Sequence, residues 1–272
     1  MIKACLILAV TSVAIGASLA LLPPPASWLA ATGALAGAAT LVAWATFRVN
    51  SSFWIQTHWK APGSSRAVAL TFDDGPDELY TTRVLDILSD KGVPATFFVV
   101  GERVERHPDL IRRAHGLGHA IGNHSHTHSL SFHFRHGSGL RREIDACNDA
   151  IRSAIGLEPR LFRSPQGLKN WALGDALRER GMAAFAWQAR GMDYVIRDPE
   201  RIARRVVDGA VAGGVLLLHD GGGLPGSADR SATVQALPMI IDGLRARGFT
   251  FVRADELFAV PAYRVECAEA TR

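Results

Sequence analysis

The sequence predicts an α/β fold with a parallel sheet, preceded by two N-terminal transmembrane helices. The 272 residues are 48% hydrophobic and 21% charged, a composition that excludes a disordered tail protein and a fibrous repeat. Residues 1–47 contain one charged residue, Lys3. From about residue 66 onward, seven strand-like segments alternate with helix-like segments. Such alternation indicates a parallel sheet with crossover helices, open or closed.

The composition also limits the function. The formal charge is +4, and Arg is interspersed with Asp and Glu, which is typical of a solvated surface and predicts no nucleic-acid partner. The three cysteines, Cys5, Cys147 and Cys267, lie far apart and form no disulfide framework or zinc ribbon. Any metal site must therefore use histidines and carboxylates.

Two apolar segments occupy the N-terminus. Residues 4–22 are apolar over a length sufficient to cross a bilayer core of roughly 30 Å. Three prolines, residues 23–25, cannot continue that helix. A second apolar segment covers residues 27–47, with Trp28 and Trp44 near its ends, where indoles favour the membrane interface. We therefore predict a helical hairpin in the membrane.

The alternative for the first segment is a signal peptide with small residues 16–20 at its cleavage site. The second segment would still anchor the protein. Basic residues lie on both outer sides of the hairpin, namely Lys3 before it and Arg48, Lys60 and Arg66 after it. The positive-inside rule then places both ends of the hairpin, and with them the rest of the chain, in the cytoplasm.

The remaining chain divides into a linker (residues 48–65), a domain (66–258) and a C-terminal tail (259–272). Short apolar runs predict strands at residues 67–72, 94–100, 119–122, 160–162, 183–188, 214–218 and 248–252. Apolar spacing, N-terminal prolines and C-terminal glycines predict helices at residues 80–90, 108–115, 140–155, 171–180, 199–211 and 232–247.

In such folds the chemistry collects at the carboxyl ends of the strands. Asp73 and Asp74 follow the first strand. Neighbouring carboxylates repel each other, so a cation or a shared proton is expected there. The alternative is a turn that uses Asp-Gly-Pro only for its geometry.

Seven of the ten histidines lie between His115 and His136. His124 and His128 are four residues apart, which on a helical turn places both imidazoles on one side. Imidazole suits zinc or a related divalent metal, and Asp74 is available as a third ligand. The alternative is a solvated histidine-rich loop.

Three further strand ends carry polar residues. Arg163 can orient a carboxylate, and Asp193 is its expected partner. The turn at residues 165–167 can present a backbone N–H to an oxyanion. His219, directly after an apolar strand, is a good general acid. Each residue alone has a structural alternative, but their joint placement at five strand ends predicts metal-assisted hydrolysis of a carbonyl compound.

These segments resemble the motifs of the polysaccharide deacetylase family, also called the NodB homology domain or carbohydrate esterase family 4. Residues 71–76 (TFDDGP) and 124–128 (HSHTH) match its first two motifs. Residues 163–167 match the third, with Gln166 at the usual aromatic position, and residues 217–219 match the fifth. Asp193-Tyr194 corresponds loosely to the fourth, and Arg190 stands where an acidic residue is usual. The resemblance covers about residues 65–258.

The resemblance implies a distorted (β/α)7-type barrel and a role for each motif residue. Asp73 would be the general base, and Asp74, His124 and His128 would bind one divalent metal, zinc or alternatively cobalt or nickel. His219 would be the general acid. Arg163 would hold Asp73 in position, and Asp193 would in turn orient Arg163. Leu217 would line the pocket for the acyl group, and the backbone N–H of Gln166 would help to bind the oxyanion.

The implied activity is that of a membrane-anchored, metal-dependent deacetylase in the bacterial inner membrane. It would remove the N-acetyl or N-formyl group of an amino sugar in a glycan or a lipid-linked cell-envelope precursor. One alternative is an outward-facing deacetylase of peptidoglycan or an exported polysaccharide. Two others are a non-catalytic sugar- or metal-binding relic and a histidine-rich metal chaperone or sensor. His133 and His136 lie in the loop at 129–139, either on the substrate side or simply solvated.

Overall fold

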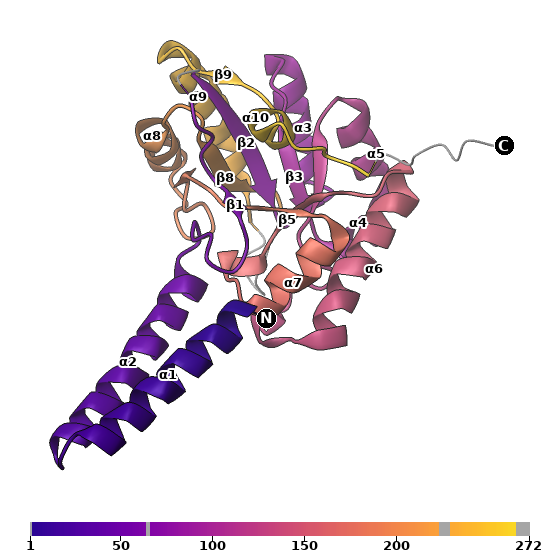
Figure 1. The fold of residues 1–272 in the computed structure, drawn as a ribbon. Helices are drawn as coiled ribbons and strands as arrows, with labels where there is room; N and C mark the ends of the chain where they lie inside the picture. Colours follow the sequence, from indigo (N-terminus) through magenta and orange to yellow (C-terminus); the bar gives the residue numbers. More distant parts are fainter. Residues whose placement is uncertain (1, 64–65, 223–228, 265–272) are drawn as a thin grey trace.

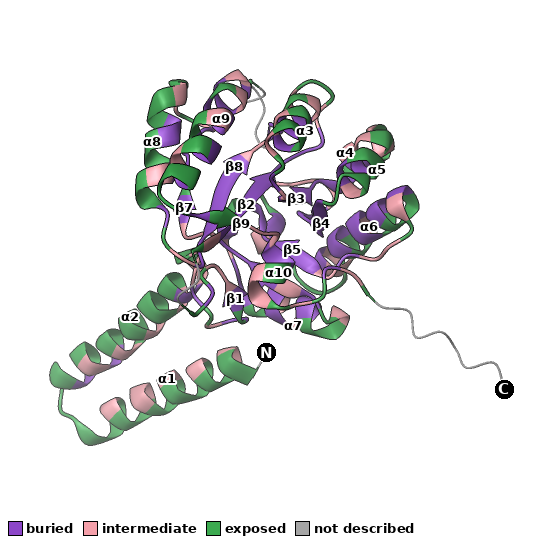
Figure 2. Ribbon diagram, turned by 90° about the horizontal axis from the view of Figure 1, so that it is seen from above, coloured by how far each residue is buried: buried purple, intermediate pink, exposed green. Residues whose placement is uncertain are grey.

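The computed structural model describes residues 2–63, 66–222 and 229–264. Two helices, α1 (Ile2–Leu21) and α2 (Ala26–Phe47), lie side by side and extend from one end of a globular part (Figure 1). Both are long and apolar enough to cross a membrane, and they are almost entirely exposed (Figure 2). This exposure is unlike that of a core helix in a soluble protein, but α1 also has the length and position of a signal sequence.

A curled parallel sheet forms the globular part. Its strands pair in the order β1-β6-β5-β4-β3-β2-β8-β7, and β9 pairs with the start of β2. The bounds are β1 Thr57–His58, β2 Ala67–Asp73, β3 Thr96–Val99, β4 Ala120–Asn123, β5 Leu161–Arg163, β6 Ala183–Phe185, β7 Ala189–Arg190, β8 Val215–His219 and β9 Thr250–Phe251.

When the domain is viewed as in Figure 2, helices lie around the sheet and one helix, α10, lies over its middle. They are α3 Tyr80–Lys91, α4 Gly101–Arg106, α5 Pro108–Gly116, α6 Gly137–Ile155, α7 Trp171–Arg180, α8 Pro199–Gly209, α9 Ser231–Ala246 and α10 Ala254–Phe258. Two 3₁₀ turns, η1 (Phe132–Phe134) and η2 (Pro165–Gly167), interrupt the loops. All six helices predicted in this part are present. The sequence did not predict α4, α10 and the 3₁₀ turns, because they are too short to show an apolar period.

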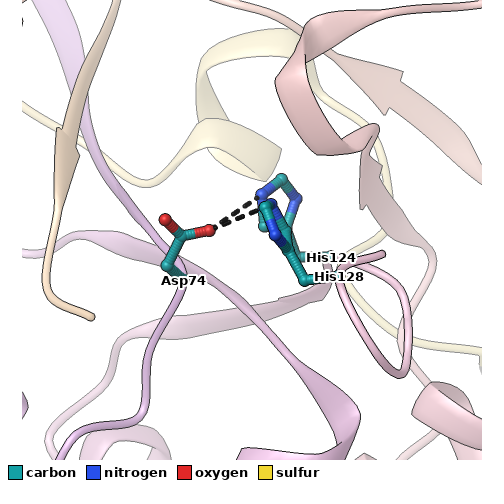
Figure 3. Close-up of side chains that lie close together, drawn as sticks. All are labelled: Asp74, His124 and His128. Carbon is teal, nitrogen blue, oxygen red and sulfur yellow. Dashed lines mark ion pairs between the residues drawn. The ribbon is translucent and has the colours of Figure 1, made fainter. Parts of the chain in front are cut away.

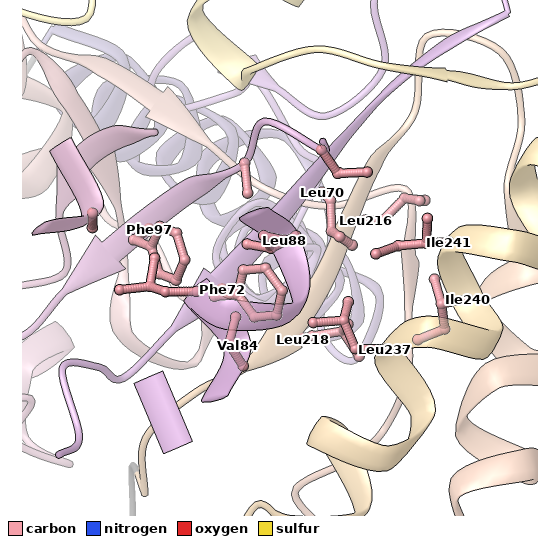
Figure 4. Close-up of a cluster of buried hydrophobic side chains, with 14 of the residues drawn as sticks. Leu70, Phe72, Val84, Leu88, Phe97, Leu216, Leu218, Leu237, Ile240 and Ile241 are labelled. Atoms are coloured by element: carbon pink, nitrogen blue, oxygen red, sulfur yellow. The ribbon is translucent and has the colours of Figure 1, made fainter. Parts of the chain in front are cut away.

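Strand β2 shows that one face of the sheet packs in the apolar core while the other face carries the residues of the site. Side chains alternate along a strand, so Leu70 and Phe72 face outward against α3 and α9 in the main apolar cluster (Figure 4). Both are fully buried, and each contributes about 1.5–3 kcal/mol of hydrophobic free energy. Ala69, which precedes Leu70 and faces the other way, packs in a separate cluster. Thr71 and Asp73 therefore point to the inner face of the curled sheet.

The predicted single strand at residues 183–188 is wrong in one respect. β6 pairs with β5, whereas β7 pairs with β8 at the other edge of the sheet. Only three residues, 186–188, join these two strands. The sheet must therefore curl until its edges meet, which gives the expected barrel-like form. A continuous run of apolar residues does not reveal that its first part pairs with β5 and its last part with β8.

Part of the segment expected as a linker belongs to the sheet. Thr57 and His58 pair with β6, and Ala61 N–H donates to Gly213 C=O at 2.8 Å. Part of the expected tail is also packed, because the hydroxyl of Tyr263 accepts from Ile121 N–H at 3.0 Å. Residues 265–272 of that tail lie outside the described residues.

Candidate active site

A pocket of about 270 Å³ lies at the carboxyl ends of the strands. Seven of the nine residues predicted for the site line it: Asp73, Asp74, His124, His128, Gln166, Leu217 and His219. The other two, Arg163 and Asp193, are buried behind it, at 0% and 1% exposure. The structure thus brings together residues from five separate strand ends.

Asp74, His124 and His128 form the cluster drawn in Figure 3. Their potential ligand atoms all lie within 4.8 Å of one another. Asp74 Oδ1 is 3.2 Å from His128 Nε2 and 3.5 Å from His124 Nε2. This buried oxygen has no hydrogen-bond partner among the described residues, an unfavourable state that a cation relieves. One carboxylate and two imidazoles are a donor set suited to a divalent metal such as zinc.

The charges around the cluster agree with this donor set. Burial alone would raise the pKa of Asp74, but the contact with His124 and the nearby histidine charges lower it overall. Burial lowers the pKa of His128. Burial also acts to lower the pKa of His124, yet Asp73, Asp74 and the Arg163 carbonyl together outweigh it and the net shift is upward. The same negative charge that draws a proton to His124 would attract a divalent cation.

The loop after β4, rather than a helical turn, brings the two imidazoles together. Ser125 and His128 have positive φ angles of 68° and 49°, so the predicted helical spacing is wrong as a reason for their convergence. Asp74 also has a positive φ, of 73°. Non-glycine residues rarely adopt this region, and such strain clusters at functional sites. His124 Nδ1 bonds Arg163 C=O at 2.8 Å, which turns Nε2 toward Asp74.

Asp73 is held by a buried arginine, as predicted. Arg163 Nη1 donates to Asp73 Oδ1 at 2.6 Å and to Thr71 Oγ1 at 2.8 Å. The guanidinium also lies over the ring of Phe98, 4.1 Å from its centroid. Asp73 Oδ2 remains directed toward the cluster, 3.7 Å from His124 Nε2. One carboxylate oxygen is therefore anchored while the other faces the pocket.

Asp193 holds His219, so the predicted pairing of Asp193 with Arg163 is wrong. Asp193 Oδ1 lies 2.9 Å from His219 Nδ1, and Oδ2 accepts from His219 N–H at 2.8 Å and from Thr233 Oγ1 at 2.9 Å. The reason is the change of sheet edge: Asp193 follows β7, which lies beside β8 and not beside β5. Burial acts to lower the pKa of His219, but the Asp193 carboxylate, with smaller contributions from Asp74 and Asp73, outweighs it and raises the pKa to about 9.

A fourth buried carboxyl lies next to His219. Asp220 Oδ2 accepts from Thr81 Oγ1 at 2.6 Å, and burial raises the pKa of Asp220 to about 7. A Cβ on Gly75 would lie 2.3 Å from Asp220 Oδ2, so only glycine fits at that position. Asp220 was not predicted as a site residue, although it follows His219 directly in the sequence.

Four other residues contribute to the site but were not predicted as site residues. Trp187 and Tyr194 line the pocket and add aromatic surface near Gln166, whose φ is 54°. Trp187 lies two residues after the end of β6, so its position near a strand end was a usable signal. Arg230 is buried and donates to Gly221 C=O at 2.7 Å, but no motif marks it. Thr71 lies within the first motif, and its contact with Arg163 depends on the barrel interior.

The fold and this cluster define a class: α/β-barrel hydrolases in which a divalent metal and a carboxylate base act together. The family model described as polysaccharide deacetylase matches residues 60–185, a region that begins after the two N-terminal helices.

Relatives of known name agree with that match. The chain is 37% identical over 202 residues, 73% of its length, to a peptidoglycan-N-acetylglucosamine deacetylase of Bacillus cereus, of which it covers 91%. It is 35% identical over 206 residues, 72% of its length, to a chitooligosaccharide deacetylase of Bradyrhizobium sp., of which it covers 93%. The chain belongs to the polysaccharide deacetylase family, and it is a metal-dependent hydrolase of amide carbon–nitrogen bonds.

Its fold is also similar to a solved structure of this family. The crystal structure of the Bc1960 peptidoglycan N-acetylglucosamine deacetylase, in complex with a naphthalenyl hydroxybenzamide, aligns with a TM-score of 0.70 and 29% identity. The alignment covers 76% of this chain and 94% of that one. The likeness extends over the curled sheet and its helices as a whole.

Proposed function

We propose that the protein removes the N-acetyl or N-formyl group of an amino sugar, with the nine predicted residues in the roles that their geometry supports. The observation that carries this proposal is the arrangement of Asp73, the Asp74–His124–His128 cluster and His219 around one pocket. A base, a metal site and an acid are the three elements of metal-assisted amide hydrolysis.

Asp74, His124 and His128 would hold one divalent cation, zinc or alternatively cobalt or nickel. When bound, such a cation polarises a carbonyl group and acidifies a water molecule. Asp73 would accept the proton of the attacking water. Arg163 binds one oxygen of the Asp73 carboxylate, and the second oxygen of that carboxylate stays turned toward the pocket.

His219 would donate a proton to the departing sugar nitrogen, because an amine anion is a poor leaving group. Asp193 holds the ring in place through Nδ1, which leaves Nε2 to face the substrate. Leu217 is 3% exposed and lines the pocket, where it would contact the acyl methyl group. The backbone N–H of Gln166 would bind the oxyanion.

The relatives carry names that refer to peptidoglycan and chitooligosaccharides, and both names concern acetylated amino sugars. Trp187 and Tyr194 would offer aromatic faces to a pyranose ring. We propose residues 1–47 as two membrane spans and residues 66–258 as the catalytic domain. The basic residues around the spans favour a cytoplasmic catalytic domain at a bacterial inner membrane. The names of the relatives favour the alternative, an outward-facing enzyme of peptidoglycan or an exported polysaccharide.

Acetate release from chitotetraose by the full chain in detergent tests the activity. Asp73→Asn should abolish release while the chain still binds one metal ion, because Asp73 acts as base and not as ligand. Asp90→Asn, an exposed residue at the end of α3, is the matched control. Unchanged turnover in Asp73→Asn would refute the general-base role. No turnover in the wild type with one bound ion would favour the relic, and several weakly bound ions would favour the chaperone.

The orientation has its own test. A reporter active only outside the cytoplasm, fused after Arg272, should be silent on a well-expressed fusion. An active reporter would place the domain outside and make peptidoglycan and exported glycans the substrates to assay.

A further inference from the structure

The end of the membrane anchor packs against a wall of the pocket. Lys169 N–H donates to Thr46 C=O in the last turn of α2 at 3.4 Å, and Lys169 Nζ donates to Val49 C=O. A Cβ on Gly167 would lie 2.8 Å from Val49 Cγ1, so Val49 contacts the turn that carries Gln166. Since Gln166 lines the pocket, the anchor and the pocket share one short segment, residues 164–170.

The pocket also opens toward the membrane side of the domain. In Figure 1 the arrowhead of β2 points toward the end of the domain from which α1 and α2 extend. The pocket lies at the carboxyl ends of the strands. If the two helices span a bilayer, its surface therefore lies close to the pocket entrance.

The most exposed large apolar side chains of the described globular part lie at this same end. Leu130, Phe134 and Val195 are 60%, 73% and 62% exposed. They belong to the loops that follow β4 and β7, and Leu130 lines the pocket. At the opposite end, Leu117 and Val211 are only 42% and 37% exposed. Apolar side chains around a functional opening, beside a membrane anchor, fit the interfacial layer of a bilayer.

A cation lies at the edge of the same pocket. Arg190, in β7, is exposed and lines the pocket next to Leu217 by strand register. No hydrogen bond or ion pair joins its guanidinium to another side chain in the described part of the chain. A free guanidinium beside a sugar pocket suits a phosphate oxygen, which it can bind in a bidentate manner.

We propose that Leu130, Phe134 and Val195 enter the membrane interface, so that the pocket takes an N-acylated amino sugar linked through phosphate to a membrane lipid, with Arg190 on the phosphate. This inference rests on the proposed function and narrows its substrate class. It holds for either orientation of the domain, because the anchor places the pocket at the membrane in both.

The full chain should be assayed in vesicles of phosphatidylethanolamine and phosphatidylglycerol. Three substrates separate the contributions: polyprenyl-diphosphate-linked N-acetylglucosamine, the same sugar on a methyl diphosphate, and chitotetraose. The wild type should prefer the lipid-linked sugar by about tenfold or more in kcat/KM, since burial of two or three apolar side chains supports such a gain.

The double variant Phe134→Asp/Val195→Asp should lower that preference by about tenfold relative to the methyl diphosphate, because charged side chains avoid the interface. Neither residue lines the pocket. The matched control is Leu117→Asp/Val211→Asp, with the same charge change at the opposite end, and it should keep the preference. A preference that survives in the first variant would overturn the membrane contact.

Arg190→Glu should raise KM for both phosphate-bearing substrates about tenfold more than KM for chitotetraose. The control, Arg205→Glu, changes an exposed arginine of α8. An equal rise for all three substrates would overturn the phosphate contact. Acetate release from chitotetraose alone would refute this inference and leave the proposed function intact, whereas no acetate from any substrate would refute the proposed function itself.

Discussion

Asp73 and His219 are register partners at the ends of the adjacent strands β2 and β8, and each is held by a buried partner of opposite charge. Arg163 binds one oxygen of Asp73 and leaves the other directed to the cluster. Asp193 instead uses both of its oxygens on the ring and the backbone of His219. A cation beside one group and an anion beside the other favour opposite charges on them, which is how one pocket can contain both a base and an acid.

The largest predicted effects come from removing the two groups themselves. Asp73→Asn and His219→Asn should each lower kcat by about 10²- to 10⁴-fold, the usual contribution of a positioned acid or base. Acetate release at saturating substrate measures this, with metal content determined for both variants. If one of the two kept wild-type kcat, the pocket would have a single proton-transfer group and the comparison above would fail.

Loss of Arg163 should act mainly on stability. Arg163→Met leaves the buried Asp73 carboxylate without its cation, and breaking a buried pair costs about 3–5 kcal/mol. Denaturant unfolding of the full chain in detergent, followed by tryptophan fluorescence, measures the change. Arg205→Met, at an exposed position, should change the free energy of unfolding by less than about 0.5 kcal/mol. A loss below about 1 kcal/mol in Arg163→Met would show that water replaces the guanidinium.

Asp193→Asn should shift the pH profile. The pKa of His219 is raised to about 9 by Asp193, so the acid is protonated at neutral pH and activity should fall as pH rises through about 9. Without that carboxylate the lowering effect of burial remains, and the alkaline limb should move to lower pH by more than about one unit, with kcat at pH 8 reduced about 10- to 100-fold. A profile identical to that of Asp90→Asn would contradict the pairing.

The pairing of Asp193 with His219 also makes the free energy of unfolding depend on pH. Because the pKa of His219 in the folded state lies above its ordinary value, the stabilisation is complete below pH 6.5 and is lost as pH rises through about 9. The wild type should therefore lose stability between these limits, measured as the denaturant midpoint. Asp193→Asn should show a flatter dependence over the same interval.

The smallest predicted effect is on KM and comes from the contact between Trp187 and the substrate. Trp187→Ala should raise KM for chitotetraose about 2- to 10-fold and leave kcat nearly unchanged, since an aromatic contact contributes about 0.5–1.5 kcal/mol. Trp171→Ala is the control, because Trp171 is 37% exposed and does not line this pocket. A tenfold fall in kcat with unchanged KM would instead assign Trp187 to the reaction.

The amino-acid sequence alone predicted which residues form most of the site. An apolar run predicted β2 and placed Asp73 and Asp74 at its end, and helix signals such as Gly92 and Gly181 located α3 and α7 to within one residue. These features are local: side-chain alternation and capping depend on neighbours in sequence. The family likeness rested on the same short segments, and the relatives confirmed it.

The pairing of Arg163 with Asp73 was expected from the family resemblance, but the other contacts of the site became visible only in the tertiary structure. Asp193 binds His219 rather than Arg163 because the chain changes sheet edge between β6 and β7. The imidazoles of His124 and His128 converge through positive φ angles in a loop, which no helical spacing encodes. The contact of α2 with the turn at Gln166 joins residues more than a hundred positions apart. Sequence patterns report the periodicity of one element, whereas such pairings depend on how a curled sheet brings its edges and its anchor together.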